Sequence, residues 1–511
     1  MISRLFSMGL LGLEAFVVEV EADISKGLPC FDIVGLPGMA VKESRERVRA
    51  AIKNCGFEYP VSRITMNLAP ADKKKEGPVY DLPLLMALLQ STGQIQANTD
   101  DCVFIGELSL TGAIRPVRGV LPMAIAAKEA GFYRFFVPAE NAREGAVVEG
   151  LEVYPVASVQ ELADHLNGRN LLHPAVFDNN EPTGSFEPVL DFSDVRGQPE
   201  AKRALEIAAS GGHNVLMIGP PGSGKSMLAK RLPSILPDMT FAEMIETTKI
   251  HSIAGTIPNG GTLIRTRPFR SPHHTVSPVG LSGGGSIPRP GEISLAHNGV
   301  LFLDELPEFS RMAMEVLRQP MEDGKVSISR ANATVSYPCS VMLVAAMNPC
   351  PCGYFGHPTK PCTCSPTMVS RYLSRISGPL LDRLDIHVEV APVGFDELSS
   401  CEKAEPSAEV RKRVNRARQI QNERFAGTGI SCNARIPASM LHEVCTITEE
   451  ARRLLREAFT QLGLSARAFD RVMKVARTIA DLDGSPKIET PHAMEAVQYR
   501  SLDRRYWMRE L

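Results

Sequence analysis

The sequence predicts an α/β protein in which a mixed α+β domain precedes a parallel α/β core and a helical region. In the first part, β-branched and aromatic runs such as 15–20 and 135–137 alternate with helix-like segments such as 40–54 and 82–90. From about residue 191, apolar runs alternate with helix patterns and glycine-rich connections, which is typical of a parallel sheet covered by helices. The last part has four segments with amphipathic helical spacing, at 408–425, 448–462, 466–480 and 491–502.

The length of the chain favours several domains over one. A sequence of 511 residues with 44% hydrophobic and 22% charged residues is globular and too long for a single hydrophobic core. Segment 171–190 is rich in turn-forming residues without apolar periodicity, so it predicts a linker. We therefore expect domains at 1–170, 191–395 and 396–511.

The formal net charge of −2 conceals two unlike halves. Residues 1–200 carry 18 basic and 27 acidic side chains, whereas residues 201–511 carry 38 basic and 31 acidic ones. The whole-chain charge gives no argument for a polyanion partner, but the basic second half is compatible with nucleic-acid contact. A solvated acidic domain beside a basic one explains the same numbers, so both interpretations stay open.

The pattern of apolar segments predicts a cytoplasmic protein. The apolar start of the chain is interrupted by Glu14 and Glu19 and has no small-residue cleavage site, unlike a secretion signal. We find none of the stretches of roughly eighteen uncharged apolar residues that span a membrane, and expect no membrane partner. Because a reducing compartment disfavours disulfides, clustered cysteines are candidates for metal ligands.

A glycine-rich turn between a strand and a helix is the strongest functional signal. The apolar strand 214–218 runs into it and a helix pattern follows. Glycines let backbone N–H groups surround phosphate oxygens, the lysine reaches the β and γ phosphates, and the serine hydroxyl binds Mg²⁺. The motif therefore predicts a site for ATP and Mg²⁺. Its residues are Gly219, Pro220, Pro221, Gly222, Ser223, Gly224, Lys225 and Ser226.

A second apolar strand, 300–303, ends in two acidic residues. Since ligands bind at the carboxyl ends of parallel strands, Asp304 is expected to face the Mg²⁺ and Glu305 to face a water molecule. A carboxylate beside that water acts as general base in its attack on the γ phosphate. Together with the phosphate loop, this pair predicts ATP hydrolysis and not binding alone.

Two further residues fit the same chemistry, each with an alternative. Asn348 ends the strand-like run 341–347 and is suited to orienting the attacking water, although Asn before Pro also starts turns. Arg383 lies between acidic residues and is suited to stabilising charge on the γ phosphate of a neighbouring subunit. A surface Arg–Asp pair is the alternative interpretation of Arg383.

The order of phosphate loop, acidic pair, Asn348, Arg383 and helical region resembles the AAA+ ATPases. This resemblance implies a site between the subunits of a ring, usually a homo-hexamer, with a C-terminal helical lid. It assigns catalytic roles to Lys225, Glu305, Asn348 and Arg383. Arg467, at the start of a predicted helix, matches the family's sensor 2 arginine, which reports the nucleotide state to the lid.

Two patterns narrow the resemblance. The long segment 249–299 and the hairpin pattern at 324–337 are similar to the helix-2 insert and the pre-sensor 1 hairpin. Magnesium chelatase ATPase subunits and MCM-type helicases share these two features. We expect Lys325 and Arg330 of the hairpin to contact DNA.

The insert has a composition suited to nucleic acid. Residues 251–300 contain four arginines and one acidic residue, and arginines with an interleaved aromatic ring suit phosphate contact and base stacking. A loop that packs between subunits is an alternative. A metal site at the His-His pair is another, although no Cys or carboxylate stands at ligand spacing. The candidate DNA-binding residues are Arg267, Phe269, Arg270, His273 and His274.

Four closely spaced cysteines follow Asn348 in a C-x-C, nine residues, C-x-C pattern. Four thiolates from two tight turns can surround one tetrahedral Zn²⁺, whereas redox-active or merely buried thiols are the alternative. We interpret 350–364 as a zinc-finger-like insertion, with His357 as a spare ligand and Tyr354 and Phe355 at a DNA-contacting tip. The proposed zinc ligands are Cys350, Cys352, Cys362 and Cys364.

Segments 75–82 and 106–141 of the first domain are similar to the proteolytic domain of Lon proteases. Lon uses a serine just after Gly-Pro and a lysine just after a Gly-Gly-x step, whereas Val79 and Leu121 stand at these positions. The resemblance implies a Lon-like (S5-like) α+β fold without peptidase chemistry. We expect this domain to serve as a structural or DNA-facing tier.

Taken together, the motifs resemble the YifB/ComM family of magnesium-chelatase-like ATPases over essentially the whole chain. Segments 267–274, 348–353 and 376–387 carry this resemblance together with the Lon-like domain. It implies a hexameric helicase that promotes branch migration during integration of incoming DNA in natural transformation, with recombination proteins as candidate partners.

Two other function classes remain as alternatives. A magnesium-chelatase subunit or protein remodeller would share the ATPase motifs, but the additional Lon-like domain and the four cysteines argue against a chelatase subunit. A protease would need the serine and lysine that Val79 and Leu121 replace.

Overall fold

The computed structural model describes residues 2–177, 190–257, 261–285, 288–330, 333–394, 404–463 and 465–507. It divides into two compact units, and most of the predicted linker 171–190 lies outside the described residues. The three predicted domain boundaries remain predictions. The N-terminal unit comprises Met1–Ser185, Phe241–Arg265 and Ser329–Tyr337. The C-terminal unit comprises Phe186–Thr240, Thr266–Ile328 and Pro338–Leu511.

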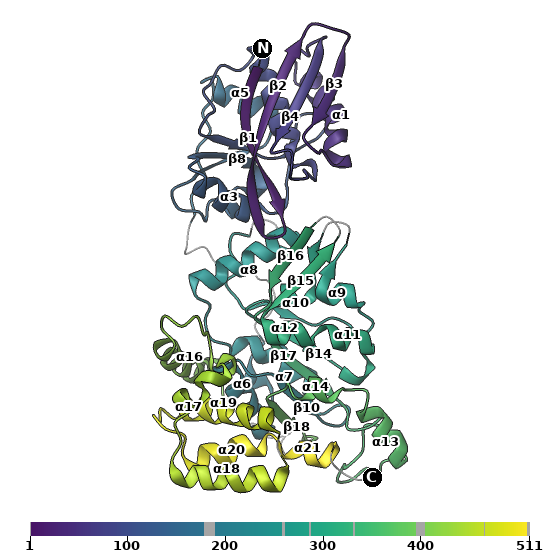
Figure 1. Cartoon of the computed structure of the whole chain (residues 1–511), viewed down its shortest axis with the longest axis vertical. Helices are drawn as coiled ribbons and strands as arrows, with labels where there is room; N and C mark the ends of the chain where they lie inside the picture. Colours follow the sequence, from purple (N-terminus) through teal and green to yellow (C-terminus); the bar gives the residue numbers. More distant parts are fainter. Residues whose placement is uncertain are drawn as a thin grey trace. The chain divides into compact units, whose positions relative to one another are not determined.

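The N-terminal unit is built on a mixed seven-stranded sheet with the order β3-β4-β2-β1-β5-β8-β9 (Figure 1). β2 pairs antiparallel with β1 and β4, whereas the other neighbours are parallel. Strands and helices alternate in this unit as the sequence predicts. The strands are β1 (Ile2–Leu11), β2 (Glu14–Ser25), β3 (Cys30–Val34), β4 (Arg63–Ala69), β5 (Cys102–Phe104), β8 (Arg134–Pro138) and β9 (Glu152–Val156), with a short β6 (Glu107–Leu108) and β7 (Ile114–Arg115) pair beside them.

The helices of this unit follow from their apolar patterns. α2 (Asp81–Ser91) is buried along nearly its whole length because its sequence is apolar on every face. α1 (Met39–Asn54) buries one stripe and exposes most of its charged side chains, whereas the half-buried Arg47 pairs with Asp81 at 2.6 Å. The Ser158 side chain caps α5 (Val159–Leu166) by accepting the N–H of Glu161. The predicted helices at 40–54 and 82–90 are confirmed; α3 (Val120–Glu129) and α4 (Ala142–Gly145) complete the set.

Helix α8 (Phe241–Ala254) belongs to the N-terminal unit and packs against α3. Its Ser252 accepts the backbone N–H of Gly119 at 3.2 Å and donates its hydroxyl to Glu144. Glu144 also accepts the backbone N–H of Leu121 at 2.9 Å. Leu121 is fully buried beside Leu263, so the position at which a Lon lysine would stand is part of an apolar contact.

The C-terminal unit contains the predicted parallel sheet. Its order is β11-β14-β17-β10-β18, and every neighbouring pair is parallel. Such a sheet brings the carboxyl ends of all its strands to one edge, where ligand sites form. The strands are β10 (Val215–Ile218), β11 (Phe269–Arg270), β14 (Val300–Leu303), β17 (Met342–Met347) and β18 (Ile386–Glu389), and a separate pair is made by β12 (Gly283–Gly284) and β13 (Arg289–Pro290).

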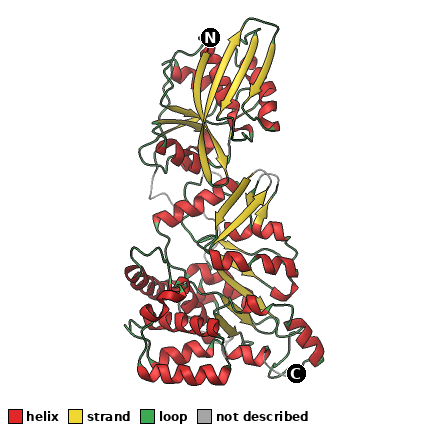
Figure 2. Ribbon diagram, in the orientation of Figure 1, coloured by secondary structure: helices red, strands yellow, loops and turns green. Residues whose placement is uncertain are grey.

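Helices flank this sheet and form the C-terminal part of the unit, which is almost entirely helical (Figure 2). The sheet and the helical region share one hydrophobic core, to which Val215, Val410 and Ile479 all belong. The predicted helix 491–502 is two helices, with a break after Gln498. The helices are α6 (Pro199–Gly211), α7 (Lys225–Arg231), α9 (Pro278–Ser282), α10 (Glu292–Leu295), α11 (Arg311–Val316), α12 (Arg318–Asp323), α13 (Pro366–Leu373), α14 (Gly378–Leu381), α16 (Ser407–Arg424), α17 (Leu441–Val444), α18 (Glu449–Leu462), α19 (Ala466–Leu482), α20 (Thr490–Gln498) and α21 (Ser501–Tyr506).

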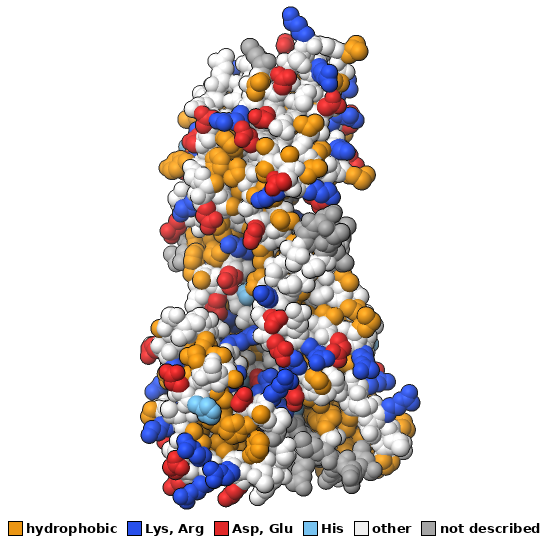
Figure 3. Space-filling view, in the orientation of Figure 1, with side chains coloured by type: hydrophobic (Ala, Val, Ile, Leu, Met, Phe, Trp, Pro, Cys, Tyr) orange, Lys and Arg blue, Asp and Glu red, His pale blue; other side chains and the backbone are white. Residues whose placement is uncertain are grey.

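The predicted hairpin is also present, as a two-stranded sheet of β15 (Lys325–Arg330) and β16 (Ala333–Pro338). On the face drawn in Figure 3, Lys and Arg side chains lie among Asp and Glu side chains, so the positive excess of residues 201–511 is interspersed with acidic groups there. Within the described residues, no helix is long and apolar enough to cross a membrane.

Candidate nucleotide site

The glycine-rich turn lies between β10 and α7, as the sequence predicts. Gly222 and Gly224 have φ angles of 78° and 90°, which L side chains rarely adopt. A Cβ at Gly219 would lie 2.3 Å from the carbonyl oxygen of Val390, so only glycine fits beside the last residues of the β18 segment. The loop is therefore wrapped tightly at the carboxyl end of β10 and before the start of α7, the position of a phosphate-binding loop.

Lys225 is buried at this turn, with 8% of its surface exposed. Its Nζ donates to the carbonyl oxygens of Gly219 at 2.7 Å and Pro220 at 2.9 Å, and to Oδ1 of Asn348 at 3.2 Å. Burial lowers the pKa of Lys225 to about 8, although the charges of Asp304 and Glu305 raise it. The structure thus brings Lys225 and Asn348 together at neighbouring strand ends.

Ser226 and Asp304 form the second contact of the site. The Ser226 hydroxyl donates to Oδ2 of Asp304 at 2.6 Å. A serine oxygen and a carboxylate at this distance are oxygen ligands of the kind that Mg²⁺ takes in phosphoryl-transfer sites. Ser226 follows β10 and Asp304 follows β14, so both lie at the carboxyl edge of the sheet and fit the predicted Mg²⁺ site.

Glu305 has an unusual backbone and an unpredicted neighbour. Its φ of 53° lies in the left-handed region, which costs a non-glycine residue roughly 1 kcal/mol or more and is characteristic of functional sites. Its carboxylate Oε2 lies 3.6 Å from Nδ1 of His274, whose ring packs 4.0 Å from that of His273. We expected His273 and His274 to bind DNA, and sequence reasoning missed the contact between His274 and Glu305.

A cavity of about 530 Å³ lies over the phosphate loop. This volume is within the range of small-ligand sites. The phosphate loop forms one wall, and Val195, Arg196 and Gln198 of the segment before α6 form another. The third wall includes Tyr354 and Lys360, which belong to the cysteine-rich insertion. Tyr354, predicted at a DNA-contacting tip, thus lines the cavity next to the phosphate loop.

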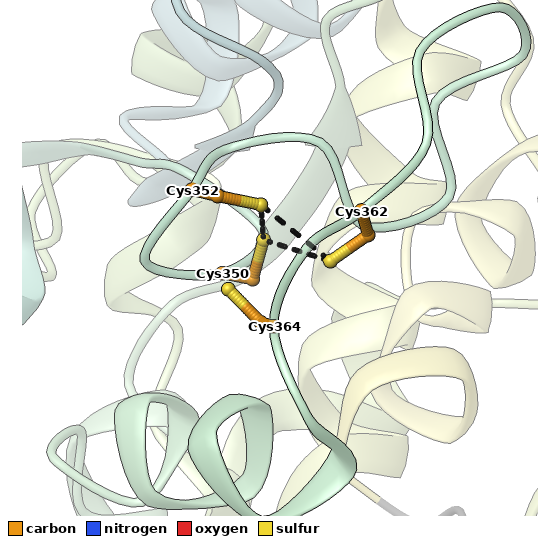
Figure 4. Close-up of side chains that lie close together, drawn as sticks. All are labelled: Cys350, Cys352, Cys362 and Cys364. Carbon is orange, nitrogen blue, oxygen red and sulfur yellow. Dashed lines mark hydrogen bonds between the residues drawn. The ribbon is translucent and has the colours of Figure 1, made fainter.

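The four predicted zinc ligands meet in the structure (Figure 4). Their sulfur atoms all lie within 4.8 Å of one another, with Sγ–Sγ distances of 3.3, 3.5 and 3.7 Å among Cys350, Cys352 and Cys362. Sulfur atoms around a tetrahedral Zn²⁺ with bonds of about 2.3 Å are separated by about 3.8 Å, so the group fits this ion. Burial raises the pKa of all four thiols, but at Cys352 the backbone N–H groups of Tyr354 and Thr363, together with the neighbouring thiols, outweigh burial and lower the pKa to about 5.

Neither Arg383, predicted to act on a neighbouring subunit, nor Arg467, predicted as the sensor 2 arginine, is among the residues that line this cavity. Arg383 is 7% exposed and forms an ion pair with Glu322, and Arg467 is exposed at the start of α19. Burial lowers the pKa of Arg383, and the charge of Arg467 is near enough to lower it further. Among the described residues, neither arginine lines the nucleotide cavity of its own chain.

The predicted DNA-binding residues of the insert have partners within the C-terminal unit. Arg267 donates to the backbone carbonyls of Pro237 at 2.6 Å and Asn298 at 2.8 Å. Arg270 forms a bidentate ion pair with Glu292 at 2.7 and 2.8 Å. The ring of Phe269 stacks at 6.0 Å from that of Phe302. These contacts position the strand β11, and DNA binding by the three residues stays a prediction.

The remaining candidates are placed as follows. Lys325 is exposed at the start of β15, and the side chain of Arg330 lies outside the described residues. The ring of Phe355 lies 6.3 Å from that of Tyr506 on α21. DNA contact by these residues also stays a prediction.

Comparison with known proteins places this site in a family. Three sequence-family models match the chain. The family 'Magnesium chelatase, subunit ChlI' matches residues 191–398, and the family 'Subunit ChlI of Mg-chelatase' matches residues 20–141. The family 'Magnesium chelatase, subunit ChlI C-terminal' matches residues 404–500. Competence protein ComM of Haemophilus influenzae is 44% identical over 98% of this chain and 97% of its own length. The chain belongs to the YifB/ComM family of magnesium-chelatase-like AAA ATPases.

Two other relatives complete the comparison. Uncharacterized protein YifB of Escherichia coli K12 is 44% identical over 98% of both chains. Lon protease of Mycolicibacterium smegmatis is 28% identical over 167 residues, which are 30% of this chain and 21% of that protease. The resemblance of this YifB/ComM family chain to Lon is therefore real but weak.

Proposed function

We propose that the C-terminal unit hydrolyses ATP with Mg²⁺ and that hydrolysis drives a hexameric DNA motor. The convergence of Lys225, Ser226, Asp304 and Asn348 at one edge of the parallel sheet carries the proposal. Lys225 is buried, its pKa is lowered by that burial, and a polyphosphate would supply the negative charge that keeps it protonated. A phosphate loop joined to an acidic strand end supports hydrolysis.

Each residue has a distinct role in this proposal. The backbone of the phosphate loop and Lys225 hold the phosphates, and Ser226 and Asp304 hold the metal. Mg²⁺, when bound, neutralises charge that develops on the phosphate oxygens. Glu305 takes the proton of the attacking water, and Asn348 orients that water from the end of β17.

Arg383 acts on the nucleotide of the neighbouring subunit in this proposal, and Arg467 reports the nucleotide state to the lid. The two positive charges lie close enough for Arg467 to lower the pKa of Arg383. An arginine supplied by a neighbour stabilises charge on the γ phosphate and makes hydrolysis depend on ring assembly. Glu322 holds Arg383 until that neighbour is present.

The DNA and the biological setting are inferred from the relationship with ComM. ComM is named a competence protein, and this chain is similar to it over nearly its whole length. We infer that the motor promotes branch migration during integration of DNA in natural transformation. This places it in the cytoplasm, with recombination proteins as candidate partners and a structural Zn²⁺ at Cys350, Cys352, Cys362 and Cys364.

A protein remodeller or magnesium-chelatase-like subunit is the second candidate. The three ChlI models that match this chain favour it, because they cover all three predicted domains. ATP hydrolysis is common to both candidates, so the substrate separates them. A partner protein that stimulates hydrolysis while branched DNA does not would favour the second.

Strand displacement on branched DNA tests the proposal. The wild-type protein should displace a strand from a three-way junction in the presence of ATP and Mg²⁺, and Glu305→Gln should abolish displacement. An ATPase that displaces no strand from any junction would contradict the DNA motor and leave the ATPase assignment intact.

A further inference from the structure

The cysteine-rich insertion, defined here as the thiolate loop 350–364, lies against the phosphate loop. Gly353 has a backbone φ of 84°, and a Cβ added to this residue would lie 2.4 Å from Cδ of Pro221. There is no room for a side chain between the two loops. The thiolate loop also begins two residues after Asn348, whose amide accepts from Lys225. The thiolate loop is thus tied to the nucleotide site twice, through Gly353 against Pro221 and through the chain from Asn348.

The thiolate loop presents side chains to the nucleotide cavity. Tyr354, His357 and Lys360 all line the cavity together with the phosphate loop. The Nζ of Lys360 lies 5.1 Å from the centre of the Tyr354 ring, and the His357 ring meets that ring edge-on at 5.6 Å. An aromatic face beside a cation matches the two chemical parts of a nucleoside triphosphate, its base and its phosphates.

The thiols are what gives this loop its shape. Of residues 350–364 only Cys350 and Gly353 are buried, so the loop has no apolar core of its own. Backbone N–H groups of Thr359 and Lys360 donate to Nδ1 of His357 at 3.1 and 3.0 Å, which shapes the turn locally. The four sulfur atoms lie close together where the two ends of the loop meet (Figure 4). A metal that binds there supplies the free energy that orders such a loop.

We propose that the thiolate loop is a wall of the ATP site, and that its metal ion is required for tight nucleotide binding. Lys360 and Tyr354 contact the nucleotide directly, and the metal holds them against the phosphate loop. The assignment goes beyond a structural finger, because it makes nucleotide affinity depend on zinc. It rests on the proposed function only in that this cavity binds ATP.

Nucleotide binding without DNA tests the proposal. A fluorescent ATP analogue is titrated into the full-length protein, and bound zinc is counted by elemental analysis. Lys360→Ala and Tyr354→Ala should each raise the Kd about tenfold with zinc content unchanged, because each removes one contact made with the nucleotide. Cys352→Ser and Cys362→Ser should lose zinc and raise the Kd at least as much.

Three controls make the outcome decisive. Lys412→Ala removes an exposed lysine of α16 and Cys30→Ser a cysteine outside the cluster, so both should bind zinc and nucleotide as wild type. Lys225→Ala should lose nucleotide binding. Zinc loss without a change in Kd would overturn the metal requirement. Wild-type affinity in Lys360→Ala and Tyr354→Ala would overturn the wall, even if the cysteine variants fail to fold.

A failure of the proposed DNA motor can be told apart from a failure of the thiolate-loop proposal. No DNA is present in this titration, so a protein that ignores DNA leaves the predicted changes in Kd untouched. A wild-type protein that binds the ATP analogue no better than Lys225→Ala would overturn the ATP site and the thiolate-loop proposal together.

Discussion

Nδ1 of the His274 imidazole lies 3.6 Å from Oε2 of the Glu305 carboxylate. Strand pairing causes this contact, because β11 and β14 are adjacent and parallel and both residues follow the ends of their strands. The Glu305 side chain is 56% exposed on a left-handed backbone, and the His274 ring lies where it can hold the carboxylate in place. His274 is therefore a positioning residue for the proposed general base.

Replacement of His274 should slow hydrolysis without weakening nucleotide binding. We expect His274→Ala to lower kcat roughly tenfold and leave KM for ATP nearly unchanged, because the carboxylate loses its orientation but the phosphate contacts remain. His274→Asn retains a polar side chain and should recover part of the rate. His442→Ala, at an exposed position in α17, is the matched control. A normal kcat in His274→Ala would refute the positioning role.

Glu305→Gln should abolish hydrolysis and preserve binding. General-base catalysis contributes about 10²–10⁴-fold, so kcat should fall by at least about a hundredfold while the Kd for ATP stays close to wild type. Glu308→Gln removes a neighbouring carboxylate that pairs with Arg375 and should hydrolyse ATP almost normally. Equal rates in the two variants would show that Glu305 is not the base. Single-turnover hydrolysis and equilibrium binding supply both quantities.

Complementation between inactive variants should reveal a site shared by two subunits. Arg383→Ala and Glu305→Gln are each expected to be nearly inactive alone. In a mixed ring, an Arg383→Ala subunit keeps Glu305 and can receive the intact arginine of a neighbouring Glu305→Gln subunit. Mixing should therefore restore part of the ATPase rate. A mixture no more active than its components would place Arg383 outside the neighbour's site.

The ion pair of Asp385 with Arg471 should stabilise the C-terminal unit in a pH-dependent way. Burial raises the pKa of Asp385, but Arg471 and His213 outweigh it and hold the pKa well below its usual range. A depressed carboxyl pKa gives stability that is complete above the unfolded value of about 3.9 and is lost as the pH falls below it. Asp385→Asn should cost about 3 kcal/mol at pH 7.

Urea unfolding checks this prediction. The difference in unfolding free energy between wild type and Asp385→Asn should shrink as the pH falls below about 4. Asp483→Asn, at an exposed carboxylate near the end of α19, should change stability little at either pH. A difference between wild type and Asp385→Asn that is independent of pH would argue that shape and not charge accounts for the loss.

Sequence reasoning located the residues of the nucleotide site because parallel strands place their carboxyl ends at one edge. That rule predicts that Asp304 and Asn348 lie at the same edge as the phosphate loop, and the contacts of Asp304 with Ser226 and of Asn348 with Lys225 agree with it. The four cysteines were found through their spacing, since C-x-C pairs bring thiols together locally. These features depend on local pattern and on one rule of sheet topology.

The features that sequence missed depend on contacts between distant segments. Nothing in the spacing of Tyr354 indicates that its loop packs on Pro221, and nothing in the His-His pair indicates Glu305 as a neighbour. Arginines in a loop predict phosphate contact by composition, but Arg270 is already held by Glu292, which also lies in the insert. Composition gives the chemistry of these side chains and not their partners.

ATPase rate and oligomeric state, measured with and without forked DNA, decide whether this chain is a DNA motor. The proposed DNA motor predicts a hexamer whose ATP hydrolysis rises when branched DNA is added, and Glu305→Gln removes that rise. A hexamer that hydrolyses ATP at the same rate with forked, duplex, single-stranded or no DNA would contradict the account.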